Sequence, residues 1–168
     1  MVPRPTQINL SRALKLKNRL VHRLAQLDHL IVGYNSTPDE NQEYDVRSLY
    51  ERRAALVKHL IDLKLTISVT NQPIQRLIFE LAECKGLVAT LLTVPTKHGP
   101  NFEGYPPVRR TYVAQFRKAE IDRETKRVEQ RIDEIQDELD RFNASTVITI
   151  DAAMMDDPDL DTVPDYEL

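Results

Sequence analysis

The chain has 168 residues, of which 29% are charged and only 6% are aromatic, with no tryptophan and just four glycines. This composition disfavours a β-sandwich or barrel, which would need more β-branched and aromatic residues and more glycine turns. Residues 151–168 contain seven acids and no Lys or Arg. Removing these seven from the 26 acids leaves 19 acids against 23 bases in the first 150 residues. The overall charge of -3 therefore combines a basic body of +4 with an acidic C-terminal tail.

Cysteine content and apolar runs exclude several classes of protein. Cys84 is the only cysteine, so the chain cannot form an intramolecular disulfide, and its place in an apolar stripe indicates a small core residue. The first residues lack the apolar run of a signal peptide. No segment approaches the roughly 18 consecutive apolar residues of a membrane span. We therefore expect a cytoplasmic protein with no membrane partner.

Two long helices are predicted after a short extended arm at residues 1–8. The first runs from about 9 to 33, with Asn9 or Ser11 as its N-cap and Gly33 just past its end. The second runs from about 44 to 70. In both, apolar residues recur three and four positions apart, as Leu10, Ala13, Leu20, Leu24, Leu27, Ile31, Val46, Leu49, Leu56, Leu60, Leu63 and Ile67. The short polar loop between the helices favours an antiparallel hairpin.

Lys17 and Arg53 interrupt these two apolar stripes. A charge between helices costs stability unless its head reaches water or an acid. The simpler interpretation is that both side chains extend to solvent. The alternative hypothesis is that they set register or oligomeric state, as polar residues in such stripes can.

Pro73 separates the second helix from a third, predicted at 74–92, because proline lacks an amide donor. This third helix is the most apolar of the chain. We expect it to be buried, either within one chain or at an oligomer interface. Residues 93–108 hold four prolines and two glycines and are predicted to form a long loop, a kind of segment that is usually functional or mobile.

A fourth helix is predicted at 113–142, with a narrow apolar stripe between charged flanks, typical of a solvated coiled-coil helix. Residues 146–150 alternate weakly, like a short strand. The tail at 151–168 is predicted to be disordered. Three roles are open for the tail. It could serve only to keep the protein soluble, or it could dock on the basic body. It could also bind a partner through the apolar residues Leu160, Val163, Tyr166 and Leu168.

Three stretches of the sequence resemble a family of helical bacterial proteins sometimes labelled septicolysin. They are Ile8-Asn-Leu-Ser-Arg-Ala-Leu-Lys-Leu-Lys-Asn, Thr66-Ile-Ser-Val-Thr-Asn, and the segment from Arg127 to Asn143. The similarity spans roughly Ile8 to Ile148, while the proline-rich loop and the tail depart from it. The resemblance implies a helical fold and no established activity. The label suggests a pore-forming toxin, but nothing in the residues supports secretion or membrane insertion, so we expect no such activity.

Candidate sites are few. Arg109 and Arg110 beside Tyr112 could grip a phosphate or a base, although adjacent arginines also arise by chance. His22 and His29 lie seven residues apart, about 10 Å along a helix, which is too far for one metal ion. The acids of the fourth helix alternate with arginines and indicate a solvated face. We expect no catalytic residue, no metal site and no cofactor.

These observations predict an all-α fold, an antiparallel helical hairpin plus two further helices forming a bundle with coiled-coil character within a single domain of residues 1–150. The predicted function is that of a non-enzymatic helical scaffold or interaction protein that forms a homo-oligomer. One alternative is a nucleic-acid-associated protein whose acidic tail competes for a basic surface. Another is an enzyme or ligand binder with its site at residues 93–110.

Overall fold

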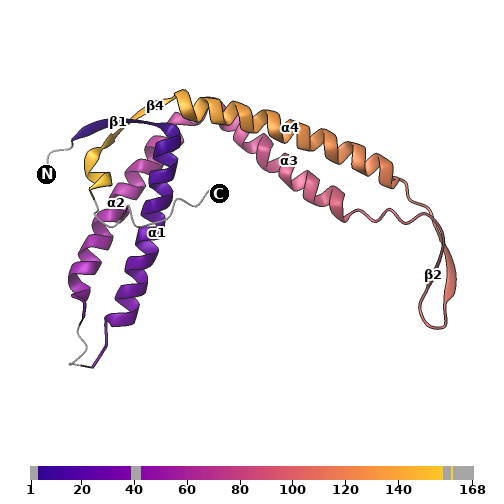
Figure 1. Cartoon of the computed structure of the whole chain (residues 1–168), viewed down its shortest axis with the longest axis horizontal. Helices are drawn as coiled ribbons and strands as arrows, with labels where there is room; N and C mark the ends of the chain where they lie inside the picture. Colours follow the sequence, from indigo (N-terminus) through magenta and orange to yellow (C-terminus); the bar gives the residue numbers. More distant parts are fainter. Residues whose placement is uncertain (1–3, 39–42, 157–159, 161–168) are drawn as a thin grey trace. The chain divides into compact units, whose positions relative to one another are not determined.

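A computed structural model of the chain describes residues 4–38, 43–156 and 160. These residues form four α-helices and two antiparallel sheets of two strands each (Figure 1). The fold is predominantly helical, as predicted. The expectation of an all-α fold was wrong, because β1 pairs with β4 and β2 pairs with β3.

The chain divides into two compact units, a division that the sequence did not predict. The first unit comprises Met1–Pro73 together with Asp140–Leu168, and the second comprises Ile74–Leu139. The long helix α4 (Lys118–Ser145) contributes to both. Each unit is built around its own pair of elements and is described separately below.

Helix α1 (Leu10–Tyr34) begins where Asn9 caps it. The Asn9 side chain accepts a hydrogen bond from the backbone N–H of Arg12 at 2.9 Å, which satisfies one of the free donors of the first turn. Gly33 does not end the helix as predicted. Its backbone is not left-handed, and the helix continues through it to Tyr34, with Asn35 as the C-cap.

Helix α2 (Val46–Thr70) runs beside α1 in the opposite direction (Figure 1), which confirms the predicted hairpin. Asp45 caps its start by accepting hydrogen bonds from the backbone N–H groups of Arg47 and Ser48. The core of the first unit lies between the two helices. The residues that α2 contributes to this core are those that the three-and-four spacing predicts, namely Leu56, Leu60, Leu63 and Ile67.

The buried stripe of α1 includes Leu10, Ala13, Leu20 and Leu27 as predicted and differs by one residue at two other positions. Leu16 and Arg23 are buried where the spacing placed Lys17 and Leu24, which are only half-buried. The buried positions run Leu10, Ala13, Leu16, Leu20, Arg23 and Leu27. The guanidinium of Arg23 donates to the side-chain oxygen of Gln26 at 3.1 Å, so the charged residue of this stripe is Arg23 rather than Lys17.

A small sheet closes one end of the first unit. Strand β1 (Pro5–Asn9) and strand β4 (Val147–Asp151) are antiparallel, with Ile8 opposite Ile148. Ile8, Ile148 and Ile150 point into the core, because alternate residues of a strand face the same side. The sequence predicted the extended arm and the short strand but not their pairing, which supplies the partner that the strand requires.

Asp151 joins the sheet to a short 3₁₀ helix, η3 (Ala152–Met155). Its carboxylate accepts hydrogen bonds from the backbone N–H of Ala153 and of Arg4, each at 3.1 Å. These bonds favour the ionised form and hold the pKa of Asp151 below its usual range.

The start of the acidic tail therefore belongs to the folded first unit, which differs from the disordered segment expected from residue 151. Met154 and Leu160 are both buried in the core, and Leu160 is only 3% exposed. Leu160 packs within its own chain and is not available as a partner-binding anchor. Val163, Tyr166 and Leu168 lie outside the described residues.

The second unit begins after the break at Pro73, which lies in a short 3₁₀ helix, η2 (Gln72–Ile74). Helix α3 (Gln75–Thr93) follows, close to the predicted 74–92. Helix α4 starts at Lys118, five residues later than predicted. The Glu120 carboxylate accepts the backbone N–H of Arg117 at 2.7 Å, which fixes that start.

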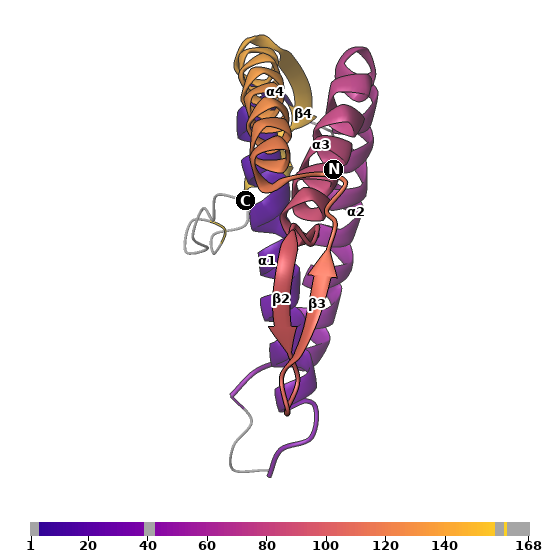
Figure 2. The same ribbon diagram turned by 90° about the vertical axis from the view of Figure 1, so that its right-hand side faces the viewer.

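Residues 99–112 form a β-hairpin rather than a loop. Strands β2 (Gly99–Glu103) and β3 (Val108–Tyr112) are antiparallel neighbours (Figure 2), so the expectation of a loop throughout 93–108 was wrong. Gly104 adopts a positive φ of 82° at the start of the turn, a conformation that suits glycine. Arg109, Arg110 and Tyr112 consequently lie on a strand.

None of the described helices combines the length and the apolar character that crossing a membrane requires.

Candidate interaction surface

Helix α3 is the most apolar helix of the chain, yet none of its residues is buried. The six residues of its predicted apolar stripe are all only partly covered: Ile74, Leu77, Leu81, Cys84, Val88 and Leu91. A helix that is apolar on most of its circumference is normally enclosed on several sides. Among the residues that the structure describes, α3 lacks that enclosure.

Helix α4 covers one side of α3. The guanidinium of Arg131 on α4 donates to the Glu80 carboxylate on α3 at 2.8 Å, which lowers the pKa of Glu80. Further along, Cys84 and Leu87 of α3 line a groove together with Val128 of α4. The buried residues of α4 are Ile121, Thr125, Val128 and Ile135, which confirms the predicted narrow stripe and extends it toward the helix start.

The side of α3 that faces away from α4 carries one large apolar side chain into solvent, Phe79, which is 63% exposed. Leu92 is also exposed, at 69%, but thirteen residues of helix turn it about 140° away from Phe79. Gly86 lies two helical turns after Phe79, on the same side of the helix, and a Cβ added there would meet no atom within 4 Å. We call the surface formed by Phe79 and Gly86 the outer face of α3.

Helix α3 carries charges of both signs. It contains two bases, Arg76 and Lys85, and two acids, Glu80 and Glu83. Its net charge is therefore zero, and the carboxylate of Glu80 is bonded to α4. The helix as a whole thus has no dominant charge of either sign.

The β2–β3 hairpin is ordered on one side by a polar network. The Glu103 carboxylate accepts hydrogen bonds from the Lys97 ammonium at 2.7 Å and from the Tyr112 hydroxyl. The Lys97 ammonium also lies 5.5 Å from the centre of the Tyr112 ring. These contacts lower the pKa of Glu103, chiefly through Lys97, and raise the pKa of Tyr112, because its hydroxyl donates to a carboxylate.

The structure separates the predicted trio of Arg109, Arg110 and Tyr112. Tyr112 is held by Glu103 and is half-buried, whereas both arginines are exposed. The two arginines point to opposite faces of the hairpin, because they are adjacent on one strand. Among residues 4–38, 43–156 and 160, neither arginine forms an ion pair.

Arg53 has a partner within its own chain. Its guanidinium makes two hydrogen bonds to the Asp28 carboxylate on α1, one of them 3.2 Å long, and lowers the pKa of Asp28. This two-pronged geometry favours one register of α1 against α2. A role for Lys17 and Arg53 in choosing the oligomeric state stays a prediction.

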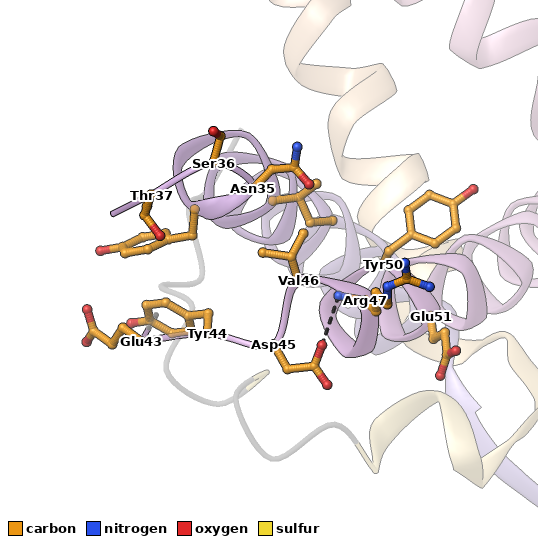
Figure 3. A pocket seen from close by; sticks show the side chains of 12 residues that line it. Asn35, Ser36, Thr37, Glu43, Tyr44, Asp45, Val46, Arg47, Tyr50 and Glu51 are labelled. Carbon is orange, nitrogen blue, oxygen red and sulfur yellow. Dashed lines mark hydrogen bonds between the residues drawn. The ribbon is translucent and has the colours of Figure 1, made fainter. Parts of the chain in front are cut away.

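A further pocket lies at the end of the hairpin where the chain passes from α1 to α2 (Figure 3). The rings of Tyr34 and Tyr44 meet there edge to face, with centres 4.6 Å apart. The Asp45 carboxylate is occupied by capping α2. Of the polar side chains that line this pocket, Asp45 thus has a structural role at the start of α2.

Within the part of the chain that the structure describes, no group of three or more His, Cys, Asp or Glu side chains could hold a metal ion. Two of the aromatic residues that the structure exposes, Phe79 on α3 and Phe102 on β2, were not singled out from the sequence. Phe79 falls outside the apolar stripe of α3 in which residues recur three and four apart. That position was the only signal in the sequence that Phe79 faces away from the side of α3 that α4 covers.

In comparisons with known proteins, no family model, no curated protein and no solved structure matches the chain.

Proposed function

We propose that the protein is a non-enzymatic helical scaffold of the cytosol that self-associates, with the outer face of α3 as the contact between copies. The observation that carries this proposal is that the most apolar helix has no buried residue within one chain. In soluble proteins, apolar surface concentrated in this way marks an interaction site.

A second copy of this chain is the occupant that the outer face suits best. In a twofold symmetric contact the same patch meets itself, so a patch of one charge sign would repel its partner. The balanced charges of α3 avoid that repulsion. Phe79 supplies a large aromatic side chain, the type that contributes most to such contacts.

Assembly through α3 would bring together pairs of α3 and α4 helices. The buried residues of α4 recur three and four apart, the spacing of helices that pack as coiled coils. We therefore propose a helical bundle with coiled-coil character in the assembled protein. The single cysteine, which leaves no intramolecular disulfide, agrees with a reducing compartment. Membership of the septicolysin-labelled family remains a prediction from the sequence.

Sedimentation velocity of the full chain over a wide range of concentrations tests this proposal. We expect a species of at least twice the chain mass of 19.4 kDa. A single species at 19.4 kDa at every concentration would remove the proposal.

A further inference from the structure

The β2–β3 hairpin combines exposed rings with positive charge. Residues 97–117 contain four bases, Lys97, Arg109, Arg110 and Arg117, and a single acid, Glu103. The Glu103 carboxylate is already bonded to Lys97 and Tyr112. The remaining three bases are exposed and give the hairpin region a local positive charge.

Strand pairing brings a ring and a cation together on one face. Phe102 lies directly opposite Arg109 in the register of the hairpin, so both side chains lie on the same face. Phe102 is 67% exposed, and Tyr105 at the turn is fully exposed. Arg110 points to the other face, opposite Asn101.

The rings of Phe102 and Tyr105 are exposed and take no part in the polar network of the hairpin. The polar network of Glu103, Lys97 and Tyr112 lies on the face that carries Arg110, because Glu103 and Tyr112 occupy the positions alternating with Phe102 and Thr111. That network orders the hairpin from one side. It leaves the face of Phe102 and Arg109 open to solvent.

We propose that this hairpin binds single-stranded nucleic acid, with bases stacked on Phe102 and Tyr105 and phosphates contacted by Arg109, while Arg110 on the other face adds positive charge. Stacking on an exposed ring tolerates any base, and arginines follow the phosphate backbone. A duplex keeps its base faces covered, so it could use only the arginines. A purely acidic protein surface would pair with the arginines and would not stack on the rings of Phe102 and Tyr105.

Fluorescence anisotropy with a labelled oligothymidylate about 20 nucleotides long measures the binding directly. We expect Phe102→Ala to weaken binding by about fivefold or more. We expect Arg109→Gln combined with Arg110→Gln to weaken it further and to reduce the dependence of log Kd on log salt by about 0.7 for each lost phosphate contact. Circular dichroism should show unchanged helix content in both variants.

The double variant Arg47→Gln, Arg123→Gln is the matched control, because it removes the same charge from two exposed arginines outside the hairpin. It should bind the oligonucleotide nearly as well as the natural chain. Equal loss in the control and the hairpin variants would overturn the proposal, and so would equal affinity for a duplex of the same length. Polyglutamate at matched charge tests an acidic protein as the partner. If it displaced the oligonucleotide, and if Phe102→Ala left oligonucleotide binding unchanged, the hairpin would bind acidic proteins instead and the proposal would also be overturned.

Discussion

Replacing Phe79 with Arg should reduce the assembled protein to a single chain of 19.4 kDa. Phe79 is exposed on the outer face of α3, so the substitution removes apolar contact between copies and places two unpaired charges at their interface. We expect Kd for assembly to rise by roughly 30-fold or more, corresponding to about 2 kcal/mol at one central contact. Light scattering coupled to size-exclusion chromatography measures the mass.

The control for this prediction is Val32→Arg, which introduces the same charge at an exposed apolar residue of α1. Its mass should equal that of the natural protein. A second variant, Gly86→Leu, adds a side chain on the same side of α3 as Phe79, at a position where an added Cβ meets no atom within 4 Å. It should also weaken assembly. If both outer-face variants retained the natural mass, α3 would not be the contact between copies.

Replacing Leu63 with Ala should lower the free energy of unfolding of the first unit by about 2–5 kcal/mol. Leu63 is completely buried between α1 and α2, so truncation removes apolar contact and leaves a cavity. Urea unfolding followed by the circular dichroism of the helices measures the change. This is the largest stability effect that we expect from a single substitution in the chain.

Leu65→Ala is a closely matched control, because it makes the same chemical change two residues away on the same helix. Leu65 is 63% exposed, and substitutions at such positions usually change stability by no more than about 0.5 kcal/mol. Comparable losses at the two positions would show that the assigned buried side of α2 is incorrect.

The helices were predictable because the signal for each of them is local. In α2, Leu56, Leu60 and Leu63 recur with the period of a helix, and the structure buries all three. Pro73 lies where a break is expected, between α2 and α3. Such features depend on neighbours within a few residues, which a sequence displays directly.

The burial of α1 was less predictable because its apolar stripe is wide. Leu14, Leu16, Leu20 and Leu24 occupy adjacent columns of the helix, so two phases of the three-and-four pattern fit almost equally well. Arg23 is buried although it is a charged residue, which the apolar pattern does not predict. Its long side chain can cover apolar surface while its guanidinium bonds to a polar partner, Gln26.

Both sheets were missed for different physical reasons. The pairing of β1 with β4 joins residues about 140 positions apart, for example Ile8 and Ile148, and no local pattern reports such a contact. The β2–β3 hairpin lacks the alternating apolar residues of an ordinary strand pair and has a proline in β2 and two more in its turn. Its polar network of Lys97, Glu103 and Tyr112 depends on the pairing itself.

The candidate interaction surface was predicted in part. The apolar character of residues 74–92 indicated a helix in need of cover. The sequence did not reveal which side of α3 is covered by α4. That depends on the bond between Glu80 and Arg131 and on the groove at Cys84, and both require the two helices to be placed side by side.

Hydroxyl-radical footprinting of the full chain measures most directly whether the outer face of α3 is covered in solution. Phe79 and Phe116 have nearly equal exposures within one chain, 63% and 58%, and the same ring chemistry. If copies of the chain meet through α3, Phe79 should be oxidised much more slowly than Phe116, and Gly86→Leu should remove most of that difference. Equal oxidation rates for the two rings in the natural protein would contradict this account.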